Sequence, residues 1–310
     1  MNNIDMKHLK YIALFVGLAL FASCNDLDVE GEIDDATMAE FYGVIGNDAT
    51  TGVKGEQYDE NDAIGIFALT PTPEAGAVAV YNNYANRHYT TSGGGDGKFV
   101  GKGEDDKIFF PINGSLNFVA YYPYTDTMSG FDYPIATGSD PLYSTIAAGY
   151  NKNNTTVGLQ FHHMLSKMRL VMQLSKNITT FDELNVSIEN VSTSGVFNVA
   201  TKEVTRAAAT IIKLDFDIAD DKKTASIEQL VMPGQNLKDV RFVFKINGSV
   251  YTWWPTESMP LESNKEFTHK LELNDDLKIV EVGVATINEW GEGYTAPDYE
   301  GISPNSRYQN

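Results

Sequence analysis

Cys24 has the most reactive side chain in this sequence, and it is the only cysteine among 310 residues. Its thiolate is a strong nucleophile that can be alkylated to a thioether. Two lysines precede an apolar run over residues 11–21, and two small residues separate this run from Cys24. This order is the layout of a secretory signal peptide. The run is shorter than the roughly 20 residues that a membrane-spanning helix needs, so we expect it to be removed.

The stretch FASC, residues 21–24, resembles the lipobox of bacterial lipoproteins. The resemblance implies that Cys24 receives a diacylglyceryl group, that residues 1–23 are cut off as a signal peptide, and that the new amino group is acylated. One acyl chain anchors a protein marginally, but several chains together hold it firmly. The alternative is an ordinary signal peptide with a cysteine near its cleavage site. An exported chain with one thiol has no internal disulfide, so its stability must come from its core.

The chain is acidic, with a formal net charge of −19. Such a charge repels nucleic acid, so we expect no nucleic-acid partner. Residues 24–37 are rich in acids and poor in bulky side chains, which predicts a flexible tether. Acidic residues directly after an acylated cysteine also resemble the surface-export signal of Bacteroidetes lipoproteins.

Apolar and polar residues alternate with a period of two in many segments, which is typical of half-buried strands. The clearest of these are residues 116–122, 168–174, 212–218, 266–273 and 277–287. Residues 39–46 are predicted to form the first strand, lying in a groove between others. Asn247 and Gly248 join two further strands and suit a type I′ hairpin, in which both turn residues have positive φ. We therefore expect an all-β protein built from β-sandwiches.

Residues 70–105 and 125–156 are rich in Gly, Pro, Asn, Ser and Thr, and we expect long loops there. The alternation resumes after them, which predicts a domain boundary near residue 160. The predicted divisions are an acidic tether, an N-terminal sandwich, a C-terminal sandwich and a tail, over residues 24–37, 38–160, 161–290 and 291–310.

Several stretches, in this order, resemble the fimbrillin family of Bacteroidetes pilins: EFYGVIGN, TTGVKGEQYDENDAIGIFAL, DKIFFP, LNFVAYYPY, LQFHHMLSKMRL, VYTWWP, NKEFTHKLEL and INEW. The resemblance implies two transthyretin-like β-sandwich domains in tandem and a lipoprotein precursor held on the outer membrane at the cell surface. In polymerising members a trypsin-like protease cuts after a basic residue and frees the first strand. Between Cys24 and Arg87 the one basic residue is Lys54, which is therefore the candidate processing site.

We interpret the chain as a structural or adhesive fimbrial subunit whose partners are other fimbrial subunits, the outer membrane through its lipid, and a host or bacterial surface ligand. The alternative is a surface lipoprotein that binds glycans for nutrient uptake. The sequence contains no pattern typical of an enzyme, a cofactor site or a metal site, and adjacent His162 and His163 point to opposite faces of a strand. Residues 126–128, DTM, resemble a short O-glycosylation signal in Bacteroides, which would place a sugar on Thr127.

The lipobox generates the first testable prediction. We expect Cys24→Ser to give an exported precursor without lipid, because a serine hydroxyl is a far weaker nucleophile at neutral pH and forms no thioether. Palmitate labelling and detergent-phase partitioning of the variant check this. Normal labelling of the variant would refute the assignment.

Overall fold

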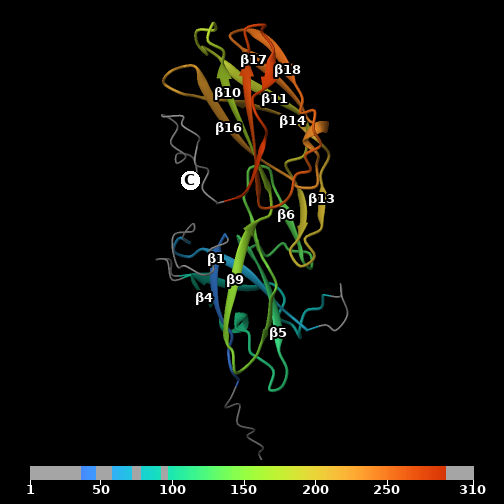
Figure 1. The fold of residues 1–310 in the computed structure, drawn as a ribbon. Coiled ribbons are helices and arrows are strands. Elements are labelled where there is room, and N and C mark those ends of the chain that lie inside the picture. The colour runs from blue at the N-terminus through green and yellow to red at the C-terminus, as the bar shows by residue number, and fades with distance from the viewer. Residues whose placement is uncertain (1–35, 47–57, 72–77, 92–96, 291–310) are drawn as a thin grey trace, which may run out of the picture. The chain divides into compact units, whose positions relative to one another are not determined.

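Strands make up nearly all the regular structure of this protein, so the prediction of an all-β sandwich fold is confirmed (Figure 1). The computed structural model describes residues 36–46, 58–71, 78–91 and 97–290, and from Thr37 onward the chain forms one compact unit. In these residues, helix is limited to two 3₁₀ turns, Glu104–Asp106 and Leu237–Asp239. No helix in the same residues is long and apolar enough to cross a membrane.

The first sheet contains eight strands: β1 (Glu40–Ile45), β2 (Ala63–Leu69), β3 (Arg87–Thr91), β4 (Lys98–Gly101), β5 (Leu116–Tyr122), β7 (Leu142–Ser144), β8 (Ala147–Tyr150) and β9 (Thr156–His163). Their order is β2-β3-β4-β1-β9-β7-β5-β8. Because β2 also pairs with β5, the strands from β2 to β5 close into a ring around one apolar core. Each strand of this ring therefore has a neighbour on both sides.

The face of β5 that was predicted to be apolar does line this core. Leu116, Phe118 and Ala120 are fully buried in it, and Tyr122 packs against it. The opposite face is also covered, because Val119 and Tyr121 belong to a second apolar cluster. This cluster includes Phe197, Met232 and Trp290 from later parts of the chain.

The later part of the chain forms two facing sheets. The larger sheet contains β10 (Ser166–Leu174), β15 (Asp217–Ile218), β16 (Thr224–Val231), β19 (Lys265–Leu273), β20 (Ile279–Glu281) and β21 (Thr286–Glu289). The smaller sheet contains β11 (Leu184–Val191), β14 (Thr210–Asp215), β17 (Arg241–Ile246) and β18 (Ser249–Trp253). A large apolar core lies between them and includes alternate residues of β10 and β11, as expected for a β-sandwich.

A small sheet connects the two parts. Its three strands lie in the order β13 (Val204–Arg206), β12 (Gly195–Asn198) and β6 (Asp132–Ile135). β6 precedes β9 in the sequence and β12 follows β10, and these two strands pair with each other. The first sheet ends with β9 at His163, and β10 begins at Ser166. The predicted boundary after residue 160 falls within β9, and the division into two domains stays a prediction.

Two expectations about the strands were wrong. The predicted loops, residues 70–105 and 125–156, contain β3, β4, β6, β7 and β8, because these strands are only three to five residues long and too short for alternation to stand out. The predicted strand over 277–287 is interrupted at Gly283, whose φ is +84°, and is divided between β20 and β21.

The hairpin between β17 and β18 turns at Asn247 and Gly248, with φ of +49° and +83°, which confirms the predicted turn. The Asn247 side chain also ties this turn to the preceding loop. Its Oδ1 accepts hydrogen bonds from the backbone N–H groups of Asp182 and Glu183 at 2.8 and 3.1 Å, and its Nδ2 donates to the Thr180 carbonyl at 2.8 Å. The turn therefore needs both the backbone conformation and the amide of asparagine.

We expect Asn247→Ala to lower the free energy of unfolding by about 2–3 kcal/mol, because it loses these hydrogen bonds and strains a positive φ. Asn247→Gly also loses the side-chain hydrogen bonds, but glycine adopts a positive φ without strain. It should therefore lower the free energy of unfolding by about 1 kcal/mol less than Asn247→Ala. Urea unfolding of both variants checks the order. Equal midpoints for the two variants would contradict the role of the backbone conformation.

Candidate functional site

The candidate site is the groove between β4 and β9 that β1 fills. β1 runs antiparallel to β4, with Phe41 opposite Phe99, and parallel to β9 along its whole length, from Glu40 opposite Thr156 to Ile45 opposite Phe161. Figure 1 shows β1 beside both neighbours. The prediction that residues 39–46 form a first strand lying between others is therefore confirmed.

Further backbone hydrogen bonds hold this segment, including one from a residue just beyond each end of β1. They join the N–H groups of Ala39, Glu40, Gly43 and Gly46 to the carbonyls of Ile108, Thr155, Gly97 and Phe161 at 2.9, 3.0, 2.8 and 2.9 Å, respectively. Removal of β1 would leave the facing N–H and C=O groups of β4 and β9 unpaired. Two facing strand edges with unpaired backbone groups are a template for another extended chain.

The inner face of β1 enters the core through Phe41, which is 0% exposed. Its ring makes edge-to-face contacts with Tyr89 and Phe118, at centroid distances of 5.0 and 5.1 Å. Burial raises the pKa of Tyr89, whose hydroxyl accepts a hydrogen bond from the Ile108 N–H at 3.1 Å. Phe41 therefore packs on two aromatic rings, and this surface suits the aromatic side chain of another strand.

The outer face of β1 is held much more weakly. Val44 is 41% exposed. Lys98 Nζ lies 3.5 Å from Glu40 Oε1 and 5.6 Å from the centre of the Tyr42 ring. A hydrogen bond with Tyr42 and then the charge of Glu40 raise the pKa of Lys98. Ion pairs this exposed contribute little to stability, so β1 is held chiefly by its ladder and its inner face.

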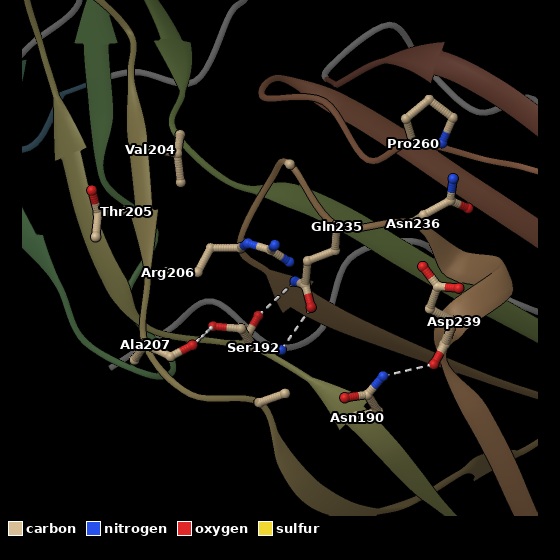
Figure 2. A pocket seen from close by; sticks show the side chains of 12 residues that line it. Asn190, Ser192, Val204, Thr205, Arg206, Ala207, Gln235, Asn236, Asp239 and Pro260 are labelled. Carbon is tan, nitrogen blue, oxygen red and sulfur yellow. Dashed lines mark hydrogen bonds between the residues drawn. The ribbon is translucent and has the colours of Figure 1, made fainter.

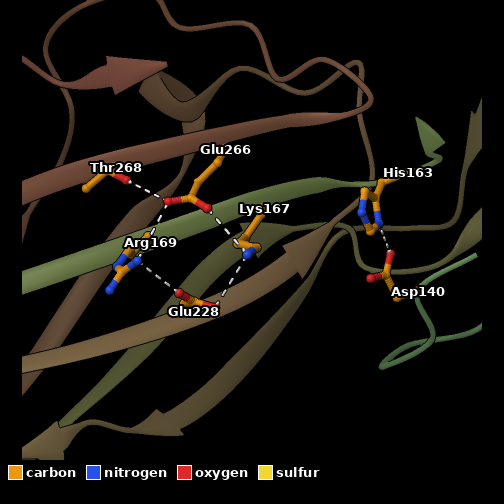
Figure 3. A network of polar contacts seen from close by, with 7 residues as sticks. All are labelled: Asp140, His163, Lys167, Arg169, Glu228, Glu266 and Thr268. Carbon is orange, nitrogen blue, oxygen red and sulfur yellow. Dashed lines mark hydrogen bonds and ion pairs between the residues drawn. The ribbon is translucent and has the colours of Figure 1, made fainter. Parts of the chain in front are cut away.

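The larger sheet of the later part contains a matching strand that is held on both faces. β10 is antiparallel to β16 and parallel to β19, as β1 is to β4 and β9. On its outer face, Lys167 Nζ lies 3.4 Å from Glu266 Oε2, and Arg169 Nη1 lies 3.3 Å from Glu228 Oε1 (Figure 3). The Lys167 and Arg169 side chains are 14% and 9% exposed. Arg169 and Glu266 are buried, and Glu228 is partly exposed. Removing one partner from a largely buried ion pair is destabilising, so β10 is held on both faces, whereas β1 is held mainly on one.

The other predicted modification sites are placed as follows. Cys24 and Lys54 lie outside the described residues, and Lys54 falls in the segment 47–57 that follows β1. Thr127 lies on an exposed turn, where its Oγ1 is 2.8 Å from the Thr125 Oγ1. Lipidation, cleavage and glycosylation at these three residues stay predictions.

The four histidines in the described part of the chain have separate structural partners. His163 Nδ1 lies 2.9 Å from Asp140 Oδ1 (Figure 3), and His162 Nδ1 lies 3.2 Å from Asn264 Nδ2. His269 Nδ1 lies 2.7 Å from Glu281 Oε1, and His88 stacks on a tyrosine ring. In the described part of the chain, no three acidic, histidine or cysteine side chains form a group that could hold a metal ion.

A pocket of about 810 Å³ lies beside β13 (Figure 2). Its lining within the described residues includes no aromatic side chain on which a sugar ring could stack. The amide of Gln235, one of the lining residues, is bonded to the backbone: Oε1 accepts from the Ser192 N–H at 2.7 Å, and Nε2 donates to the Ser192 and Met232 carbonyls. The pocket therefore gives the glycan-binding alternative no specific support.

Sequence reasoning found β1 but missed the residues that surround Gly43 in its centre. The rings of Tyr58, Phe99 and Phe161 close around this glycine from three other segments. A glycine inside a strand pattern was the available signal, because such a glycine often marks a close approach of another part of the chain.

The sequence matches the fimbrillin-like family over residues 50–290, and the chain therefore belongs to that family. It is 25% identical over 264 residues to Fim1C of Bacteroides uniformis, described as a candidate fimbrium subunit, covering 78% of this chain and 81% of Fim1C.

Two crystal structures share the fold. One is a candidate cell adhesion protein of Bacteroides uniformis, with a TM-score of 0.61 and 22% identity over 83% of this chain and 99% of that one. The other, from Bacteroides ovatus, is described in the same words and has a TM-score of 0.59 and 20% identity, over 82% and 97% of the two chains.

The geometry of β1 generates a prediction about its local stability. We expect Phe41→Ala to weaken the attachment of β1 by about 3 kcal/mol or more, because it leaves a cavity beneath a fully buried ring. Val44→Ala, on the exposed face, should cost less than about 1 kcal/mol. Hydrogen exchange of the β1 amides, followed by mass spectrometry, measures both. If the two substitutions accelerate hydrogen exchange of the β1 amides equally, β1 is not held mainly by its inner face.

Proposed function

We propose that this chain is a structural or adhesive subunit of cell-surface fimbriae that joins its neighbour by exchanging β1 for a strand of another subunit. Membership of the fimbrillin-like family supports the fimbrial role. The single observation that carries the exchange is the position of β1, a six-residue strand inserted between β4 and β9 and held on one face. A donor strand would restore the same two ladders and the same apolar contact.

Cleavage would make strand exchange possible, but it would not by itself release β1. Burying one large apolar side chain contributes roughly 1.5–3 kcal/mol, and β1 buries Phe41 while Ile45 packs against the same core. Cutting the chain after β1 leaves these contacts intact. The cut strand therefore stays in place until a donor with a comparable ladder competes for the groove.

Export and processing complete the proposal. Cys24 would anchor the precursor to the outer membrane through its acyl chains, and the acidic tether would hold the folded part away from the surface. Cleavage at Lys54 would separate β1 from β2, because Lys54 lies between these strands in the sequence. The partners would then be other fimbrial subunits and a surface ligand, and Thr127 would be accessible to glycosylation on its exposed turn.

The two-domain division is part of the same proposal. β1 and β10 each open a run of strands, and each is antiparallel to one neighbour and parallel to the other. This repeated arrangement supports two sandwiches in tandem, the second beginning near β10. The proposed second sandwich is the fixed one, because its first strand is locked by the network around Glu228 and Glu266.

The proposal predicts how a cut chain behaves. The test uses an engineered variant of the signal-free protein, in which the recognition sequence of a specific protease replaces the residues around Lys54. After cutting, we expect a monomer that retains β1. We expect release of the N-terminal fragment and formation of oligomers when intact candidate subunits supply a donor strand. Light scattering coupled to size exclusion, with mass spectrometry of the released fragment, measures both steps.

The matched control is the same chain with Lys54→Ala and no recognition sequence, which should stay monomeric under all conditions. If the bond is cut and β1 leaves, but no oligomer forms with any candidate subunit, strand exchange is rejected for this chain. The subunit would then be an anchor, a tip or a binding module.

A further inference from the structure

Gly43 lies at the centre of β1, where three aromatic rings meet. A Cβ atom at this position would lie 2.9 Å from Phe99 Cε2, 3.0 Å from Phe161 Cε2 and 3.2 Å from the Tyr58 hydroxyl oxygen. Ordinary van der Waals contacts between such atoms are about 3.5–4.0 Å. The groove therefore has no space for even one methyl group at this point.

The three rings have little freedom to move away. The Tyr58 ring packs edge-to-face on Phe99 at a centroid distance of 4.9 Å and on Phe161 at 6.2 Å. Phe99 and Phe161 are 2% and 0% exposed, and Tyr58 is 7% exposed. Because buried side chains are packed as densely as organic crystals, displacing one ring requires its neighbours to shift too.

The backbone around Gly43 is also closely approached. Gly43 N–H donates to the Gly97 carbonyl at 2.8 Å. Gly97 has φ of +64°, and a Cβ there would lie 2.5 Å from the Gly43 carbonyl oxygen. The absence of a side chain at both glycines thus allows the backbone just before β4 to approach the backbone of β1 closely.

We propose that the groove selects its donor strand by a glycine: the incoming strand must be an extended segment that carries glycine at the position of Gly43. Two residues before it, an aromatic side chain fills the Phe41 site. Two residues after it, an aliphatic side chain replaces Ile45. The strand runs parallel to β9. This inference rests on the proposed strand exchange and names the chemistry of the partner segment.

Selection at one position follows from the shape of the groove. At the buried Phe41 site an aromatic ring strengthens binding of the strand, whereas at the Gly43 site any side chain weakens it by steric overlap. Together they fix the register, because sliding the strand by two residues would place a bulky side chain against Phe99 and Phe161. A steric penalty of this kind discriminates between donors by exclusion, not by added attraction.

The test uses the full signal-free chain, cut at a recognition sequence in segment 47–57, and fluorescent peptides that displace β1. The reference peptide is AEFYGVIG, residues 39–46. Peptides with Gly43→Ala and Gly43→Val add carbon at the closed position. A peptide with Val44→Ile adds carbon on the exposed face and is the matched control. Fluorescence anisotropy gives each affinity.

We expect the alanine peptide to bind about tenfold more weakly than the reference and the valine peptide about a hundredfold more weakly, because overpacking costs roughly 1–3 kcal/mol and 1.4 kcal/mol is tenfold. The isoleucine control should bind as the reference does. In addition, Phe99→Leu in the protein should open space beside position 43. The difference in affinity between the reference peptide and the Gly43→Ala peptide should therefore become smaller.

The outcomes separate the two claims. If the reference peptide binds and the alanine and valine peptides bind equally well, glycine selection is wrong and strand exchange stands. Equal weakening by the Val44→Ile control would also overturn the inference, because the penalty would not belong to the closed position. If the reference peptide itself fails to displace β1, the proposed strand exchange is rejected, and the inference with it.

Discussion

The ladder between β1 and its two neighbours is the interaction on which the account depends. β1 supplies the contacts that join β4 to β9, and so it closes the ring of strands around the first core. A ring is stable because every edge is paired, and it becomes an open groove when one strand is missing. The same strand that completes the fold is therefore the natural point at which a second chain can enter.

The contrast between β1 and β10 explains why one strand could be exchanged and the other could not. Both hold the same position relative to their neighbours, but β10 is longer and carries Lys167 and Arg169 into a partly buried ionic network. β1 instead presents Val44 and one exposed ion pair to solvent. The contacts that hold strands in place are thus unevenly distributed over the molecule, as the proposed strand exchange would require.

Much of this fold could be predicted from local sequence patterns. Alternation gave the buried faces of β5 and β10, and the Asn247–Gly248 pair gave the hairpin, because these features depend on neighbouring residues. The short strands β6 to β8 and the pairing of β2 with β5 could not be predicted in this way. The closed space at Gly43 is also a long-range property, since its walls come from segments far apart in the sequence.

The most direct test of strand exchange is the structure of fimbriae isolated from the cell surface, determined by electron cryomicroscopy at side-chain resolution. We predict that the strand between β4 and β9 belongs to a different subunit from those two strands, with an aromatic ring at the Phe41 site. Assembled fimbriae that still contain residues 40–45 of the same chain in that groove would rule out strand exchange at β1.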